Sequence, residues 1–239
     1  MQLSKLEEKA YRELKKNGFI AFKIQDLISI LNIDETKAYN LAKALKKKNA
    51  IKSIKGFLVF KDANEFAVGS CINWPSYVSF WSALNYYGFS DQIPRKIFFA
   101  TTKYAKDAEN FKYVTISKKR FFGYKKIGDV VIADKEKAII DSLLFPKYAG
   151  GIKEIYNSLK SRQKEFDAEK LIVYALKIDS KAVLRRLGFV LETVGYRGNN
   201  IKKSLKKLKK NIGRGYELLD PTLLKKNNLN NKWLLDVNW

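Results

Sequence analysis

The sequence of 239 residues contains no histidine and a single cysteine, Cys71. Without histidine, the chain cannot build Ser-His-Asp or Cys-His nucleophile systems, histidine general bases or His-ligated metal sites. One cysteine can form neither an intrachain disulfide nor a cysteine cluster for zinc. Among enzyme classes, only a nuclease built on carboxylates and lysine is compatible with the remaining residue types.

Long hydrophobic runs are missing as well. Every apolar run is far shorter than the roughly 18 residues that a membrane span needs. Met1 leads directly into a polar helical pattern, so we expect no signal peptide, a cytoplasmic location and no membrane partner. Apolar residues nevertheless make up 46% of the chain and aromatic residues 13%, which is enough to bury a sizeable core in one or two domains.

Acidic residues are scarce: 24 aspartates and glutamates face 47 lysines and arginines, which gives a formal net charge of +23. A charge of this size indicates the kind of partner rather than the fold. Nucleic acid, an anionic membrane surface and an acidic protein are the candidate partners, and a lysine-rich surface without a partner is the alternative. Thermophilic surfaces usually mix both signs of charge, so the excess of cations favours nucleic acid.

The first sixty residues have the pattern of a winged helix-turn-helix domain, which we place at residues 1–62. Apolar residues at helical spacing predict a helix that starts near Gln2 and stops at Gly18, followed by a short apolar run. A short second helix and a third helix capped by Asp34 follow, and residues 51–54 and 57–60 form a hairpin around Lys55-Gly56. In this pattern the third helix enters the major groove and the hairpin contacts the DNA backbone or minor groove.

The third helix has one apolar and one basic face. Ala38, Leu41 and Leu45 form the stripe that packs inward. The outward face carries an amide, a hydroxyl and several cations. Asparagine can pair with adenine, and lysine can reach guanine or phosphate. The predicted DNA-binding residues, including two on the hairpin, are Thr36, Lys37, Tyr39, Asn40, Lys43, Lys46, Lys47, Lys52 and Lys55.

The alternative for this helix is an ordinary amphipathic helix with a solvated lysine face. Such a face would normally intersperse glutamate for i,i+4 pairs. Residues 36–61 contain eight lysines and no acidic residue, which favours the DNA-binding hypothesis.

Residues 63–70 are expected to be a linker, and residues 71–239 an α+β domain with a helical C-terminal part. Pro75 is expected to open a helix that runs to Gly88. Its aromatic side chains, among them Tyr77 and Phe80, are expected to belong to the core. Strands are expected at 96–101, 111–116 and 130–133. The further helices are expected at 135–145, 152–161, 168–176 and 181–194.

Candidate catalytic chemistry is confined to one acidic cluster. Asp129, Asp134, Glu136 and Lys137 could be imagined as a metal-dependent nuclease site. The acids and the lysine would then have to line a pair of strands around a metal, whereas residues 134–137 have the pattern of a helix start. Capping of that helix by Asp134 is the favoured interpretation. We therefore predict no catalytic residue, no metal ligand and no cofactor.

Several passages of the central segment resemble the AbiEi antitoxin family. They are residues 77–94 (YVSFWSALNYYGFSDQIP), 111–116 (FKYVTI), 120–124 (RFFGY) and 133–141 (ADKEKAIID), continued by Pro146 and Gly150-Gly151. The resemblance covers roughly residues 5–195. It implies an N-terminal winged helix that represses the protein's own operon, and a C-terminal domain that counters a nucleotidyltransferase-like toxin encoded beside it.

The C-terminal segment contains a strongly basic amphipathic helix, predicted at residues 199–212. Ile201, Leu205 and Leu208 form its inner seam. Its outer face is cationic, and the residues of this second basic surface are Lys202, Lys203, Lys206, Lys207 and Lys210. A contact with the DNA backbone, a contact with an anionic protein and a solvated face remain open. Membrane binding is disfavoured because the apolar side lacks tryptophan and phenylalanine.

The sequence thus predicts a non-enzymatic transcriptional regulator. In this hypothesis it binds double-stranded DNA at its own operator and acts as the antitoxin of a toxin–antitoxin pair. The alternatives are the metal-dependent nuclease and a non-specific architectural DNA-binding protein.

Overall fold

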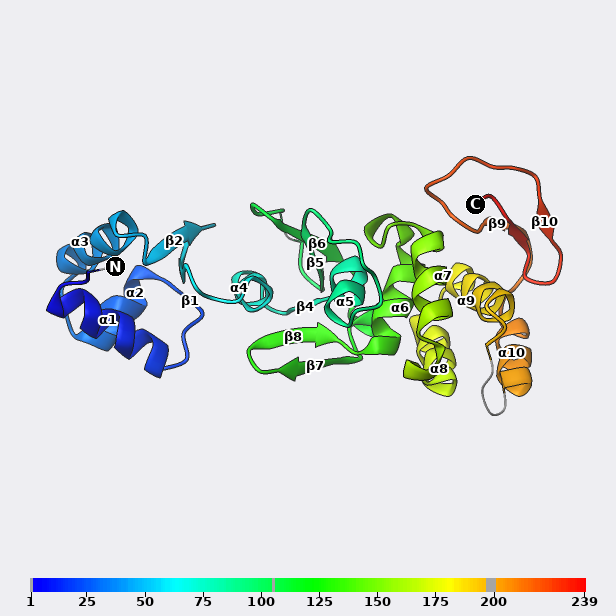
Figure 1. Cartoon of the computed structure of the whole chain (residues 1–239), viewed down its shortest axis with the longest axis horizontal. Helices are drawn as coiled ribbons and strands as arrows, with labels where there is room; N and C mark the ends of the chain where they lie inside the picture. The colour runs from blue at the N-terminus through cyan, green and yellow to red at the C-terminus, as the bar shows by residue number, and fades with distance from the viewer. Residues whose placement is uncertain (1, 105, 197–200) are drawn as a thin grey trace.

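The structure is a computed structural model that describes residues 2–104, 106–196 and 201–239. The chain has a mixed α+β fold, which confirms the predicted class. Its elements follow one another along the long axis of an elongated molecule (Figure 1). The first sixty residues lie at one end, a five-stranded sheet lies in the middle, and the last helices with the C-terminal tail lie at the other end.

The first sixty residues form three helices and a small antiparallel sheet with the strand order β1-β3-β2. These elements are α1 (Lys5–Lys16), β1 (Ala21–Phe22), α2 (Ile24–Leu31), α3 (Glu35–Lys47), β2 (Ile51–Ile54) and β3 (Phe57–Phe60). Helix α1 begins later than expected because the Ser4 hydroxyl caps it. Leu14, Leu27 and Leu45, one from each helix, are fully buried and form a core of this unit's own.

The segment 63–70, expected to be a linker, is largely helical instead. Helix α4 (Glu65–Ile72) is capped by Asn64, whose side-chain oxygen accepts a hydrogen bond from the Phe66 amide at 2.9 Å. Its residues 67–70 are buried against the central sheet. At Gly69 a Cβ atom would lie 2.2 Å from the ring of Phe99. Small residues such as Gly69 therefore permit close packing of this helix against the sheet.

The central sheet has the strand order β6-β5-β4-β8-β7. Its strands are β4 (Ser76–Val78), β5 (Ile97–Thr101), β6 (Phe111–Thr115), β7 (Tyr124–Ile127) and β8 (Val130–Ala133). Strand β4 is antiparallel to β5 and parallel to β8. The pair β5–β6 is parallel, and the pair β7–β8 is antiparallel. The three predicted strands are confirmed. Strand β7 carries mostly exposed side chains and gave no apolar signal.

The helix predicted to open at Pro75 is wrong over its first residues. Residues 76–78 form β4 in the middle of the sheet, and helix α5 (Phe80–Tyr86) begins only afterwards. Tyr77 and Val78 are fully buried, and β4 pairs with β5 on one side and β8 on the other. Pairing with two neighbouring strands outweighs the helical spacing of the aromatic residues. The expectation that Tyr77 and Phe80 belong to the core is confirmed.

Helices make up most of the remaining chain. They are α6 (Lys135–Leu144), α7 (Ile152–Ser161), α8 (Ala168–Ile178), α9 (Lys181–Thr193) and α10 (Ile201–Lys209), joined by short 3₁₀ turns. The predicted helices between residues 135 and 194 are confirmed. Helix α10 ends before the predicted limit at residue 212, and predicted residues 199–200 lie outside the described chain. None of the described helices is long and apolar enough to cross a membrane.

The C-terminal tail folds back onto α9. It contains β9 (Glu217–Leu218), β10 (Leu229–Asn230) and β11 (Leu235–Asp236). Trp233 is buried over Gly188, where a Cβ atom would lie 2.2 Å from the indole. The buried Arg185 and Arg186 donate hydrogen bonds to the carbonyls of Ile212 at 2.8 Å and Leu219 at 3.0 Å. The helical body and the tail therefore share one core.

Candidate nucleic-acid interface

Helix α3 presents two chemically distinct faces. Asp34 caps its start by accepting a hydrogen bond from the Lys37 amide at 2.8 Å. Ala38 and Leu45 are fully buried and attach the helix to the core of the N-terminal unit. The polar residues predicted to face outward are all exposed; they are Thr36, Lys37, Tyr39, Asn40, Lys43, Lys46 and Lys47. The structure thus brings these residues together on one surface.

Most cations of this surface have no acidic neighbour. Lys37 forms an ion pair with Asp34 at 3.0 Å. The backbone hydrogen bond from Lys37, reinforced by its ammonium group, lowers the pKa of the Asp34 carboxyl. Among the described residues, no carboxylate lies within 4.0 Å of the ammonium groups of Lys43, Lys46 or Lys47. These three lysines are therefore available to a polyanion.

The two hairpin lysines have a different environment. Lys52 pairs with Glu109 at 3.5 Å and with Glu65 at 3.9 Å. Lys55 donates a hydrogen bond to the Lys106 carbonyl and lies 5.5 Å from the ring centre of Tyr113. Burial against these groups lowers the pKa of Lys55. Lys52 thus contacts α4 and the segment between β5 and β6, and Lys55, although exposed, contacts that segment and β6. Lys43, Lys46 and Lys47 of α3 make no such contacts within the described chain.

Apolar packing reinforces this contact of the hairpin. Ile54 and Val59, from β2 and β3, belong to the core cluster of the central sheet rather than to that of the N-terminal unit. The hairpin therefore joins the two parts of the molecule. The sequence contained no signal for this role. Glu109 is remote from the hairpin along the chain, and Glu65 lies in the segment expected to be a linker.

The second basic surface is formed by α10 at the opposite end of the molecule (Figure 1). Leu208 is fully buried, and Leu205 is half-buried toward α8 and α9. Every lysine predicted for this surface is exposed, namely Lys202, Lys203, Lys206, Lys207 and Lys210. The body of the protein separates these lysines from those of α3.

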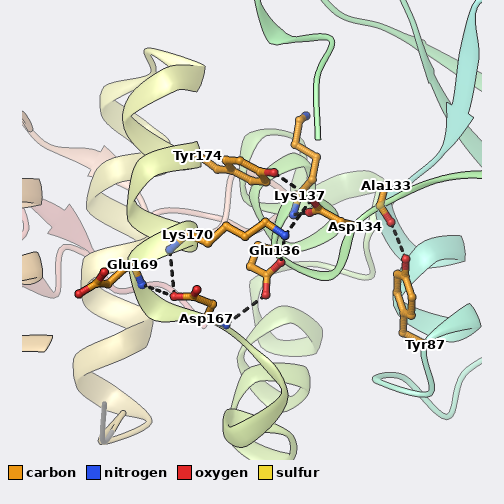
Figure 2. Close-up of polar contacts among 9 residues, drawn as sticks. All are labelled: Tyr87, Ala133, Asp134, Glu136, Lys137, Asp167, Glu169, Lys170 and Tyr174. Carbon is orange, nitrogen blue, oxygen red and sulfur yellow. Dashed lines mark hydrogen bonds and ion pairs between the residues drawn. The ribbon is translucent and has the colours of Figure 1, made fainter. Parts of the chain in front are cut away.

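Asp134 and Glu136, two acids of the cluster considered for a nuclease, are engaged in structural contacts. Asp134 caps α6 through the Lys137 amide at 2.8 Å, as expected, and accepts a hydrogen bond from the Tyr174 hydroxyl at 2.9 Å. Figure 2 shows Lys170 of α8 between Asp134 and Glu136, with ion-pair distances of 3.0 and 2.8 Å. Among the described residues, no three acidic or cysteine side chains are grouped so that they could hold a metal ion.

Lys137, the basic residue considered for that cluster, points into the core instead. Its ammonium group pairs with Asp141 one turn along α6 and donates a hydrogen bond to the Tyr77 hydroxyl at 3.0 Å. Tyr77 and Ser79 in turn donate hydrogen bonds to Asp141 at 3.0 and 2.8 Å. Desolvation lowers the pKa of Lys137. Sequence reasoning missed this network; its signal in the sequence was the i,i+4 spacing of Lys137 and Asp141 in α6.

Comparison with known proteins gives the fold but no family. No family model matches the chain, and no curated protein matches its sequence. Among solved structures, the fold is similar to that of the RV2827C protein from Mycobacterium tuberculosis, with a TM-score of 0.70. The two chains share 12% sequence identity over 98% of this chain and 92% of the other. At this identity the similarity describes the fold alone.

Proposed function

We propose that the protein is a DNA-binding transcriptional regulator whose residues 1–62 act as a winged helix-turn-helix domain. The order of three helices and a hairpin supports this proposal. The observation that carries it is the outward face of α3, where Asn40, Lys43 and Lys47 are exposed together. In this proposal α3 enters the major groove, Asn40 contacts a base edge and the lysines contact phosphates or guanine.

The hairpin contributes little to DNA binding in this proposal. Lys52 and Lys55 are engaged with Glu109, Glu65 and the Lys106 carbonyl. Recruiting either lysine to a phosphate would require breaking these contacts. We therefore assign the DNA interface to α3 and assign the hairpin to the junction with the central sheet.

We further propose that the regulator represses its own operon and acts as an antitoxin. Support comes from the resemblance of residues 77–151 to the AbiEi antitoxin family. In this proposal the partner is a nucleotidyltransferase-like toxin encoded beside the regulator. We propose that the regulator is not an enzyme, because Asp134, Glu136 and Lys137 of the one candidate nuclease cluster are engaged with Tyr174, Lys170 and Asp141.

A gel shift on the protein's own upstream region, with excess random duplex as competitor, tests the DNA-binding part. We expect a competitor-resistant complex that the double variant Lys43→Ala/Lys47→Ala loses. Lys153→Ala/Lys164→Ala, which removes two exposed lysines far from α3, is the matched control and should bind as the parent does. Binding without sequence preference would favour an architectural protein instead, and metal-dependent cleavage of plasmid would favour a nuclease.

Growth rescue tests the antitoxin part. The full chain is co-expressed with the neighbouring nucleotidyltransferase-like open reading frame, and we expect it to restore growth. The Lys43→Ala/Lys47→Ala variant separates the two activities, because rescue by this variant would mean that protection does not depend on DNA binding. Failure of the full chain to rescue growth would contradict the antitoxin proposal and leave the regulator proposal intact.

A further inference from the structure

Helix α10 carries a dense cationic ridge. Its nine residues span about 13 Å. The ridge consists of the exposed residues Lys202, Lys203, Lys206, Lys207 and Lys209 of the helix, together with Lys210 just beyond it. Within the described part of the chain, no carboxylate lies within 4.0 Å of any of these ammonium groups. Like charges at this density repel one another, so binding of a polyanion would reduce the repulsion among the ridge lysines.

Grooves run along both sides of the ridge. The groove toward α8 has a volume of about 490 Å³; four ridge lysines line one side, and Glu169, Ile172 and Val173 of α8 line the other. The groove toward the tail is lined by Lys202, Lys206 and Lys209 on the ridge side, and by Trp233 and the ion pair of Lys232 with Glu192 on the other. The lysines therefore project on both flanks, and the charged surface is broader than one row of side chains.

The chemistry of the ridge favours phosphate over protein or membrane. Protein interfaces are depleted in lysine and enriched in arginine and aromatic residues. The ridge contains neither of these. Membrane-surface helices insert apolar side chains outward, whereas Leu205 and Leu208 of α10 are turned toward α8 and α9. Lysine binds phosphate groups as a mobile point charge without geometric demands, so the ridge suits a nucleic-acid backbone read without regard to sequence.

The position of the ridge decides which nucleic acid it can reach. Helix α3 and helix α10 lie at opposite ends of the long axis, with the central sheet and α6 to α9 between them (Figure 1). The α3 surface and the ridge therefore lie far apart on the molecule (Figure 1). A duplex bound in the major groove by α3 would have to extend along the whole body to contact the ridge as well.

We propose that the α10 ridge is a second, sequence-independent phosphate-binding site that holds a different duplex segment from the one at α3. One chain then bridges two segments of double-stranded DNA. The part of this proposal that concerns α3 rests on the proposed function, whereas phosphate binding by the ridge does not. Bridging would place distant segments of one DNA molecule, or two DNA molecules, on the same regulator.

The test is a bridging assay with two duplexes. The upstream-region duplex is immobilised on beads, the full-length protein is bound to it, and capture of a labelled random duplex is measured. We expect capture by the parent chain. The variant Lys203→Gln/Lys206→Gln/Lys210→Gln should stay bound to the beads but capture at least fivefold less. The control Lys126→Gln/Lys153→Gln/Lys164→Gln removes the same charge from exposed sites elsewhere and should capture as the parent does.

Two outcomes would overturn the bridging proposal. Undiminished capture by the ridge variant would mean that the second duplex is held elsewhere, for example by α3 of a second copy. Absence of capture by the parent chain, together with binding of poly-glutamate to the ridge, would assign the ridge to an acidic protein. Thermal unfolding of each variant checks that the fold is unchanged.

A second measurement separates this proposal from the proposed function. The Lys43→Ala/Lys47→Ala variant is titrated with random duplex over a range of salt concentrations. Adding the three ridge changes should make the slope of log affinity against log salt shallower by about 2–3, since each phosphate contact contributes about 0.9. This result, combined with no selective binding of the upstream region by the parent chain, would contradict the α3 proposal and support the ridge. An unchanged slope would contradict phosphate binding by the ridge and leave the α3 proposal unaffected.

Discussion

Helices α3 and α10 are both lysine-rich and both attached by an apolar inner face, yet their outward faces differ. The α3 face mixes lysine with Thr36, Tyr39 and Asn40, whereas the ridge on α10 presents lysine alone. Amides and hydroxyls can discriminate base edges, while lysine alone gives attraction to any phosphate backbone. The difference shows that the net charge of +23 includes two chemically distinct basic surfaces, which we expect to differ in their selectivity for DNA.

The lysines of the hairpin belong to the same N-terminal unit as α3, but their surroundings differ from those of the α3 lysines. Lys43 and Lys47 face solvent, whereas Lys52 and Lys55 contact the central sheet and its neighbours. All four lysines lie in one acid-free stretch of sequence. Sequence density of charge therefore does not say which cations are available to a partner.

The largest expected effect is a loss of stability in the body between α3 and α10, which consists of the central sheet and α6 to α9 (Figure 1). Asp141→Ala would leave the fully buried Lys137 without its partner, so the free energy of unfolding should fall by about 3–5 kcal/mol. Urea denaturation measures the change, and Asp91→Ala, at an exposed position, is the control. A loss below about 1 kcal/mol would mean that the buried network does not hold the body together.

The next effect is expected on α3. Lys43→Ala/Lys47→Ala should weaken DNA binding about 30-fold at 0.15 M salt, because each phosphate contact contributes a factor of about five there. The loss should be similar on upstream and random duplexes, and the salt slope should fall by about 2. Fluorescence anisotropy titrations measure both quantities. Unchanged affinity would contradict the assignment of the interface to α3.

Asn40→Ala sharpens the contrast between the two helices. If Asn40 pairs with a base, its loss should reduce discrimination at one base pair by about tenfold, within the range of about 1–3 kcal/mol for a bidentate contact. Affinity for random duplex should hardly change. Competition with a set of singly substituted upstream duplexes locates the base pair. Equal losses on every duplex would show that α3 is no more selective than the ridge.

The smallest effect is expected at the hairpin. Lys52→Gln/Lys55→Gln should change DNA affinity less than about threefold, because both lysines are engaged within the protein. The ion pairs of Lys52 and the hydrogen bond of Lys55 are partly exposed, so stability should fall by only about 0–1 kcal/mol. Anisotropy and thermal unfolding measure the two effects. A loss of affinity comparable to that of the α3 variant would mean that the hairpin is part of the DNA interface.

Much of the N-terminal unit was predictable from neighbouring residues. Asp34 caps α3 as expected, and the buried stripe at Ala38, Leu41 and Leu45 fixes which residues face outward. The turn of the hairpin follows from Lys55-Gly56, where both residues have positive φ, as the tight two-residue hairpin turn requires. The candidate site on α3 was therefore visible from the sequence.

The middle of the chain was less predictable. Tyr77 in strand β4 continues the helical spacing of the aromatic residues in α5, yet β4 pairs with strands that lie more distant in the sequence. Helix α4 contains the small residues typical of a linker, but they pack against the sheet. The pairing partners of Lys52 and the burial of Lys137 likewise depend on segments far from them along the chain.

The sequence by itself determined the helices with strong caps, the hairpin, the outward face of α3 and the basic character of α10. These features depend on caps, turn conformation and i,i+4 spacing, which involve residues close together in the chain. The tertiary structure alone decided that β4 is a strand, that Lys52 and Lys55 of the hairpin contact other parts of the chain, and that α3 and α10 lie at opposite ends of the molecule (Figure 1). Those outcomes depend on contacts between distant segments, whose pairing energy overrides local preference.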